Sequence, residues 1–118
     1  MLKAIPQLLD EIRPHVRCIS AKQAAAEQFQ NQGLVIDVRE PAEHLNSPAS
    51  GAINIPRGLL EMKVLEIEKD QRKPIYLHCA TSARALLSAE QLQRIGYENV
   101  TVITCDIGKI QQACAASD

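Results

Sequence analysis

The feature that most constrains the fold of this chain is the alternation of short apolar runs with segments of helical periodicity. The apolar runs predict strands at residues 16–19, 34–38, 52–55, 75–77 and 100–103. The segments between them predict helices at residues 20–32, 41–45, 59–69 and 83–95. Apolar strands that alternate with helices are typical of a parallel sheet buried on both faces. The chain is therefore predicted to be an α/β protein of three layers, with a central, mostly parallel sheet.

The composition excludes several classes of partner. A net charge of -1 over 118 residues gives no electrostatic basis for binding nucleic acid or an anionic membrane. The apolar runs are far too short to span a bilayer, and polar residues interrupt the N-terminus where a signal peptide would need an apolar core. We therefore expect a cytoplasmic protein without a membrane span.

The N-terminal residues are expected to form an extension of the main domain. Residues 2–14 have a helical pattern that Pro6 interrupts and Pro14 stops. We divide the chain into a helical extension at residues 1–15 and one domain at residues 16–118, and we leave the oligomeric state open. The apolar side chains of the extension are expected to dock on that same domain.

Helix boundaries can also be predicted. Ser20 is expected to cap the helix at residues 20–32, with Gln23 completing a capping box and Gly33 ending the helix. Asp106 is expected to cap a final short helix.

The cysteines and histidines do not have the spacing of metal ligands. Cys18, Cys79, Cys105 and Cys114 include no Cys-x-x-Cys pair. The three histidines are also not spaced as ligands, and His78, although adjacent to Cys79, is expected to point to the opposite face of its strand. We predict neither a metal site nor a cofactor.

Cys79 lies at the junction between the strand at 75–77 and the helix at 83–95. A loop that closes onto a helix start collects backbone N–H groups and the positive end of the helix dipole, which together stabilise an anion such as a thiolate. The alternative is a buried core cysteine, because free cysteine is among the most buried residue types. Arg84 in the same loop favours a reactive cysteine.

Sites in parallel α/β sheets form beyond the carboxyl ends of the strands. The segments that follow Val38, Leu77 and Val102 should therefore meet at one edge of the sheet. This arrangement would bring together Arg39, Glu40, the loop from Cys79 to Arg84, and residues near Cys105.

Three segments resemble the rhodanese-like family of sulfurtransferases. They are Ile36-Asp-Val-Arg-Glu-Pro-Ala-Glu43, Gly51-Ala-Ile-Asn-Ile-Pro56 and Leu77-His-Cys-Ala-Thr-Ser-Ala-Arg84. Their order and spacing also fit, so the resemblance covers roughly residues 16–112. It implies the rhodanese-like fold and a rhodanese-type enzyme, similar to a thiosulfate sulfurtransferase.

The resemblance implies that Cys79 accepts a sulfane sulfur as a persulfide. The donor would be thiosulfate or a persulfide, and the acceptor a small thiol, cyanide or a cysteine of a partner protein. Arg84 would orient the donor; solvent exposure or pairing with a carboxylate is its alternative. The active-site loop would be Ala80, Thr81, Ser82 and Ala83. Sulfurtransferase loops of this family resemble this one in having four residues between cysteine and arginine, whereas related phosphatases have five.

The remaining residues of the resemblance have supporting roles. Asp37, Arg39 and Glu43 are expected to form a partly buried, paired charge network, because an unpaired buried charge is unfavourable. Arg57 is either a second anion contact or a solvated arginine at a helix start.

The chain departs from the family pattern in three places. Ser82 stands where many family loops have glycine, and it could instead be the N-cap of the following helix. Cys105 stands where a glycine is usual, either as a packed residue or as a thiol that resolves a Cys79 persulfide. The segment 45–51 lacks the more usual Gly-His-Ile. The first two departures leave open a non-catalytic protein-binding module. A phosphatase on the same fold is a third possibility and ranks lower.

Overall fold

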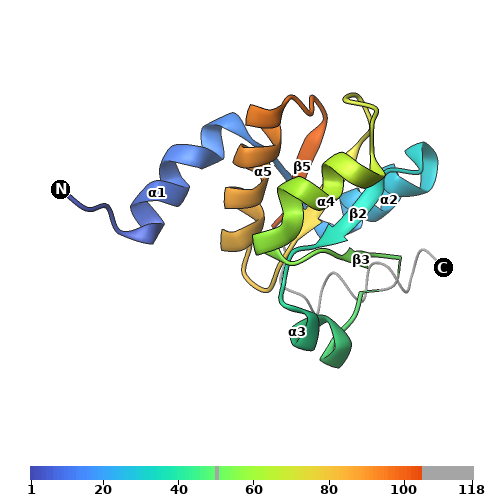
Figure 1. Cartoon of the computed structure of the whole chain (residues 1–118), viewed down its shortest axis with the longest axis horizontal. Helices are drawn as coiled ribbons and strands as arrows, with labels where there is room; N and C mark the ends of the chain where they lie inside the picture. Colours follow the sequence, from blue (N-terminus) through green and yellow to red (C-terminus); the bar gives the residue numbers. More distant parts are fainter. Residues whose placement is uncertain (50, 105–118) are drawn as a thin grey trace.

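The structure is a computed structural model that describes residues 1–49 and 51–104. A parallel sheet of five strands forms the centre of the described chain, in the order β1-β5-β4-β2-β3. The strands are β1 (Arg17–Ile19), β2 (Leu34–Asp37), β3 (Ile53–Asn54), β4 (Ile75–His78) and β5 (Val100–Ile103). The helices are α1 (Ile5–Ile12), α2 (Ala21–Asn31), α3 (Pro41–Asn46), α4 (Leu60–Ile67) and α5 (Ala83–Ile95). The 3-10 turns are η1 (Arg13–His15) and η2 (Arg57–Leu59). The predicted α/β fold with a parallel sheet is confirmed (Figure 1).

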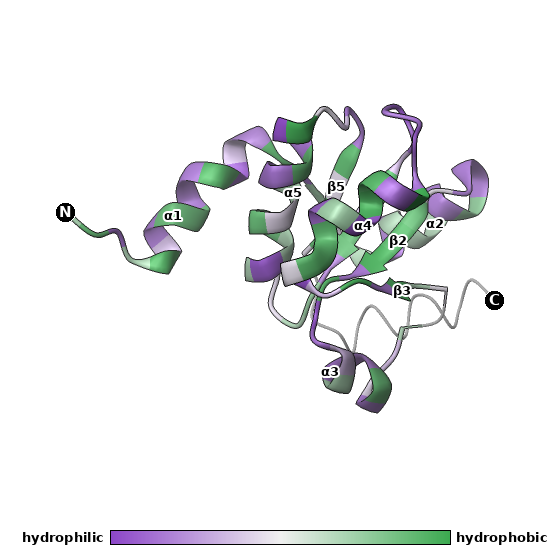
Figure 2. Cartoon of the chain, in the orientation of Figure 1, coloured by the Kyte–Doolittle hydropathy of each residue, from purple (hydrophilic) through white to green (hydrophobic). Residues whose placement is uncertain are grey.

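Helices cover both faces of the sheet, because successive strand residues point to opposite sides. In β4, Ile75 and Leu77 pack in a core with α1, α4 and α5, whereas Tyr76 packs in a second core with α2. The central strands are accordingly hydrophobic in Figure 2, and the loop between α4 and β4 is hydrophilic. The structure therefore has the three predicted layers.

Helix α1 packs against α5 through its C-terminal half (Figure 1). Leu9 and Ile12 are buried in the core shared with α5, whereas Ile5 is exposed. The expected docking on the same chain is thus observed for Leu9 and Ile12, whereas Leu2 and Ile5 remain exposed. The division of the chain at residues 15 and 16 stays a prediction.

The ends of α2 differ in detail from the prediction. Ser20 caps the helix, since its Oγ accepts a hydrogen bond from the Gln23 N–H at 3.1 Å. The predicted capping box is wrong, because the Gln23 side chain donates to Glu27 instead. The left-handed residue that ends α2 is Gln32, with φ of 59°. Gly33 serves close packing, because a Cβ there would lie 2.7 Å from Tyr76 Cε2.

The carboxyl ends of β2, β3 and β4 meet at one edge of the sheet. Asp37, the last residue of β2, is in register with His78, the last residue of β4. The Val38 N–H donates to the His78 carbonyl at 2.9 Å, and the Arg57 N–H donates to the Val38 carbonyl at 3.1 Å. This edge holds the residues predicted to form the site. Cys105, Cys114 and the helix predicted after Asp106 lie outside the described residues.

Candidate active site

Cys79 directly follows β4 and is buried, with 1% of its surface exposed. The backbone N–H of Ala85, in the first turn of α5, donates a hydrogen bond to Cys79 Sγ at 3.4 Å. First-turn amides have no partner within their own helix and form the positive end of its dipole. The strand-to-helix junction therefore places a backbone N–H donor on the Cys79 sulfur, at the start of α5.

Ser82 gives the loop between β4 and α5 its turn into the helix. Its φ of 74° and ψ of −16° lie in the left-handed region, which favours glycine. The Ser82 carbonyl accepts the Leu86 N–H at 2.9 Å, whereas its hydroxyl makes no capping hydrogen bond. Ser82 thus occupies the N-cap position without capping through its side chain. Within the same loop, Thr81 is exposed, and Ala80 and Ala83 are half-buried.

Arg84 forms an ion pair with Glu43 of α3. Its Nη1 and Nη2 donate to the two carboxylate oxygens of Glu43, at 2.7 Å and 3.1 Å. The hydrogen bonds from Arg84, with one from the Glu40 backbone N–H, lower the pKa of Glu43 to about 2. Glu43 was grouped with Asp37 and Arg39 from the sequence, but its ion pair is with the loop arginine.

Asp37 and Arg39 form a buried ion pair beside the loop. The Arg39 Nε and Nη2 donate to both carboxylate oxygens of Asp37, at 2.7–3.0 Å, and Nη2 also donates to the Ser47 carbonyl at 2.6 Å. Burial raises the pKa of Asp37, but the hydrogen bonds from Arg39 outweigh this effect and hold that pKa below its usual range. The pair ties the end of β2 to the end of α3.

Two histidines also face Asp37. His44 Nδ1 lies 2.8 Å from Asp37 Oδ2, and His78 Nδ1 lies 3.9 Å from Asp37 Oδ1. His78 is fully buried, and neither of its ring nitrogens has a hydrogen-bond partner among residues 1–49 and 51–104. Burial lowers the pKa of His78 to about 4, since the imidazolium would be desolvated. The sequence showed no metal spacing for these histidines, and it gave no signal that both surround Asp37.

Arg57 and Asn54 complete this edge of the sheet. The Arg57 side chain is half-buried and donates to Glu61 Oε1 of α4 at 2.9 Å. The Asn54 side-chain amide donates to the Asp37 and Arg39 carbonyls, at 3.0 Å and 2.9 Å. Asn54 holds β3 and β2 together, a role that the sequence analysis missed although the residue lies in the second segment of the resemblance.

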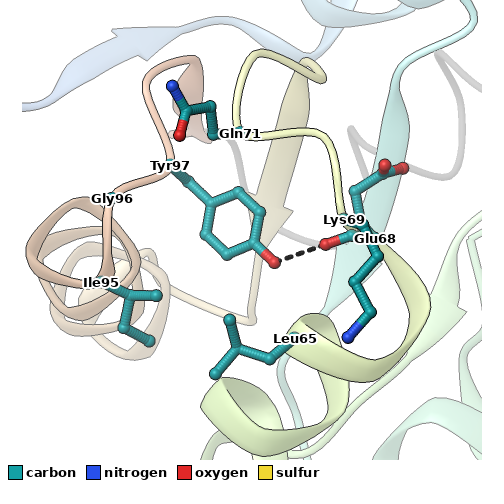
Figure 3. Close-up of a pocket in the computed structure, with 7 residues that line it drawn as sticks. All are labelled: Leu65, Glu68, Lys69, Gln71, Ile95, Gly96 and Tyr97. Carbon is teal, nitrogen blue, oxygen red and sulfur yellow. Dashed lines mark hydrogen bonds between the residues drawn. The ribbon is translucent and has the colours of Figure 1, made fainter.

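A surface pocket of about 240 Å³ lies at the other end of α5 (Figure 3). Leu65, Ile95 and Tyr97 line it, and the Tyr97 hydroxyl donates to the Glu68 carbonyl at 2.7 Å. The 13 residues of α5, about 20 Å of helix, separate it from Cys79. The described residues that line it include no cysteine or histidine. This pocket is therefore separate from the candidate active site.

Two further findings concern the described residues as a whole. Their side chains include no cluster of three or more His, Cys, Asp or Glu that could hold a metal ion. None of their helices has both the length and the hydrophobicity that crossing a membrane requires.

Comparison with known proteins identifies the family. A model described as "Rhodanese-like domain" matches residues 20–113, so the chain belongs to the rhodanese-like family. It is 42% identical over 62 residues to the uncharacterized protein YqhL of Bacillus subtilis, covering 52% of this chain and 48% of that protein. It is 30% identical over 67 residues to a protein of Allochromatium vinosum named sulfurtransferase, covering 57% of this chain and 61% of that protein. The matches thus span about half to three fifths of these relatives' lengths.

Solved structures share the fold. A protein of unknown function from Rhodopseudomonas palustris, described as a possible tyrosine phosphatase, aligns with a TM-score of 0.80 and 23% identity, covering 96% of this chain and 92% of that one. The polysulfide-sulfur transferase homodimer of Wolinella succinogenes aligns with a TM-score of 0.72 and 24% identity, covering 90% and 80%. At these identities the likeness establishes the rhodanese fold alone.

Proposed function

We propose that this chain is a sulfurtransferase that carries a sulfane sulfur on Cys79. One observation carries the proposal. Cys79 directly follows β4, and its Sγ accepts a hydrogen bond from a backbone N–H in the first turn of α5. Backbone N–H groups at a helix start bind anions, and the terminal sulfur of a persulfide is such an anion. The relative in Allochromatium vinosum, named sulfurtransferase, supports the same activity. A cysteine kept as a thiol suits a reducing compartment, and we place the protein in the cytoplasm.

The reaction divides into two transfers, and no step needs an external oxidant. The Cys79 thiolate attacks the outer sulfur of the donor, forming a Cys79 persulfide and releasing sulfite from thiosulfate, or a thiolate from a persulfide. An acceptor thiolate or cyanide then attacks the terminal sulfur. This second step forms a new persulfide or thiocyanate and returns Cys79 to the thiolate.

The neighbouring residues have distinct roles in this proposal. Residues 80–83 form the loop around the transferred sulfur, and Arg84 and Arg57 face the donor. Asp37 and Arg39 hold the carboxyl end of β2, and with it the loop after β4, in place. The reaction requires no cofactor and no metal ion.

Two alternative functions, a non-catalytic binding module and a phosphatase, differ from a sulfurtransferase in the chemistry that they require. A non-catalytic binding module would not need a cysteine whose sulfur accepts a hydrogen bond from a helix N–H, and Cys79 has this hydrogen bond. A phosphatase is the description given to the Rhodopseudomonas palustris structure. The four residues between Cys79 and Arg84 match the shorter sulfurtransferase loop, and phosphate-ester hydrolysis by this chain would be needed to favour a phosphatase.

Mass spectrometry of the intact protein tests the proposal. After incubation with thiosulfate or with a persulfide donor, the wild type should gain the mass of one sulfur atom, and a small thiol should remove it. Cys79→Ser should gain none, whereas Cys18→Ser, which removes an exposed thiol, should gain it as the wild type does. The absence of an adduct with both donors would favour the binding module.

A further inference from the structure

The geometry points to Glu43 as the residue that determines which sulfur donors this site accepts. By pairing with Arg84, Glu43 favours persulfide donors with a net charge of about −1, such as cysteine persulfide, over the thiosulfate dianion. This inference rests on the proposed sulfurtransferase function and adds a class of substrate to it.

The first argument is the occupancy of the Arg84 guanidinium. Both terminal nitrogens of Arg84 donate to Glu43, one to each carboxylate oxygen, at 2.7 Å and 3.1 Å. This is the bidentate arrangement by which arginine would otherwise bind the oxygens of an anionic donor. Thiosulfate could use it only by displacing the carboxylate.

The second argument is the balance of charge at this edge of the sheet. Arg39 is paired with Asp37, and Arg57 with Glu61, in addition to the pair between Arg84 and Glu43. Each of these three arginines therefore has a carboxylate partner. Glu43 remains ionised at neutral pH, because its pKa is lowered to about 2 by the hydrogen bonds from Arg84 and the Glu40 amide. A dianion that approaches Arg84 thus meets a neutral pair and the repulsion of a nearby carboxylate.

The chemistry of the two donors differs in charge, although the same bond forms. With thiosulfate, the S–S bond breaks and sulfite leaves with two negative charges; with a persulfide RSS⁻, RS⁻ leaves with one charge on its sulfur. In both reactions the Cys79 thiolate becomes a persulfide with a single charge, so charge and atoms balance. The thiosulfate reaction therefore brings a net charge of −2 beside Glu43, whereas a donor such as cysteine persulfide brings a net charge of about −1.

The test measures the second-order rate constant for loading sulfur onto Cys79, by mass spectrometry of quenched samples. The donors are thiosulfate and cysteine persulfide, which carries a net charge of about −1 at neutral pH from its ionised groups. The wild type should load faster from cysteine persulfide. In Glu43→Gln, the ratio of the thiosulfate to the cysteine persulfide rate constant should rise about tenfold, since one freed charge-assisted hydrogen bond has at least that effect.

Two variants isolate the effect of the ion pair. Glu66→Gln removes the same charge from an exposed pair with Lys63 on α4, and it should leave the donor ratio as in the wild type. In Glu43→Gln/Arg84→Gln, the gain for thiosulfate should disappear, because it depends on the freed guanidinium. A Glu43→Gln ratio equal to that of the wild type, or a gain that survives loss of Arg84, would overturn the inference.

A measurement on the wild type avoids any dependence on the folding of the variants. Salt screens attraction between a free arginine and a dianion, so thiosulfate loading by a free Arg84 would fall steeply as the salt concentration rises. With Arg84 neutralised by Glu43, the rate should change little or rise. A steep fall would contradict the role of Glu43 while leaving the proposed function intact, whereas failure of both donors to load Cys79 would reject the proposed function itself.

Discussion

At Ser82, one backbone angle limits the stability of the loop between β4 and α5. Its φ of 74° favours glycine, because the Cβ of any other residue is crowded in the left-handed region. Ser82→Gly should therefore raise the free energy of unfolding by about 0.5–1 kcal/mol, the relief of strain being partly offset by the greater freedom of glycine in the unfolded chain. Urea denaturation measures the change. Ser82→Ala keeps the Cβ and should not stabilise; greater stability for Ala than for Gly would refute the strain.

The buried His78 should make stability depend on pH. Its pKa is lowered to about 4 in the folded chain by burial, against an ordinary value near 6.5. Between these values the unfolded chain binds a proton that the folded chain does not, so the free energy of unfolding should fall as the pH falls from 6.5 to 4. The loss should approach about 3 kcal/mol.

Unfolding in urea at several pH values between 7 and 4 tests this expectation. His78→Leu removes the titrating group at similar volume and should flatten the dependence on pH. His15→Gln removes an exposed histidine and should keep the slope of the wild type. A slope that persists in His78→Leu would assign the dependence on pH to other groups.

At the scale of elements, substitutions in helix α1 measure how much its packing on α5 contributes to stability. Ile12 is 2% exposed in the core shared with α5, whereas Ile5 is 54% exposed. Ile12→Ala should lower the free energy of unfolding by about 2–4 kcal/mol, since it leaves a cavity in that core, and Ile5→Ala should change it by less than about 0.5 kcal/mol. Urea denaturation compares them, and equal effects would mean that α1 is undocked in solution.

The elements that the sequence predicted well are those specified locally. Helix α5 and strand β5 have the predicted bounds, because apolar periodicity and Gly96 mark them within a few residues. The end of α2 was misplaced by one residue, since both Gln32 and Gly33 fit a helix end and only the contact with Tyr76 explains the glycine.

The parts of the site that the sequence did not predict depend on contacts between distant residues. Glu43 and Arg84 are 41 residues apart and meet because β2 and β4 are neighbours in the sheet. Whether Arg84 faced solvent, a donor or a carboxylate was open until α3 and α5 were placed together. The convergence of His44, His78 and Asn54 on Asp37 likewise requires knowledge of the strand order.

At the scale of the whole molecule, Asp37 joins several parts of the chain. Its side chain contacts Arg39 and the histidines of α3 and β4, and its carbonyl accepts the Ile55 N–H and the Asn54 amide. The helix that carries Glu43 and the strand that precedes Cys79 thus share one anchor. A change at Asp37 should therefore affect both stability and the proposed sulfur transfer.

Asp37→Asn should lower the free energy of unfolding by about 3–5 kcal/mol, because it leaves the buried guanidinium of Arg39 without a counter-charge. Asp10→Asn removes an exposed carboxylate paired with Arg13 and should change stability by less than about 1 kcal/mol. Urea unfolding, followed by far-UV circular dichroism and by tyrosine fluorescence, measures both and shows whether the two transitions coincide.

The double variant Asp37→Leu/Arg39→Met separates two effects of this ion pair: the cost of burying its charges, and its role in positioning the residues around Cys79. Apolar side chains remove both buried charges, so the double variant should be more stable than Asp37→Asn. It should still load sulfur onto Cys79 more slowly than the wild type, because the bonds that tie β2 to α3 and to Ser47 are lost. Loading at the wild-type rate would show that the charge network supports the fold alone, and that the loop after β4 positions Cys79 without it.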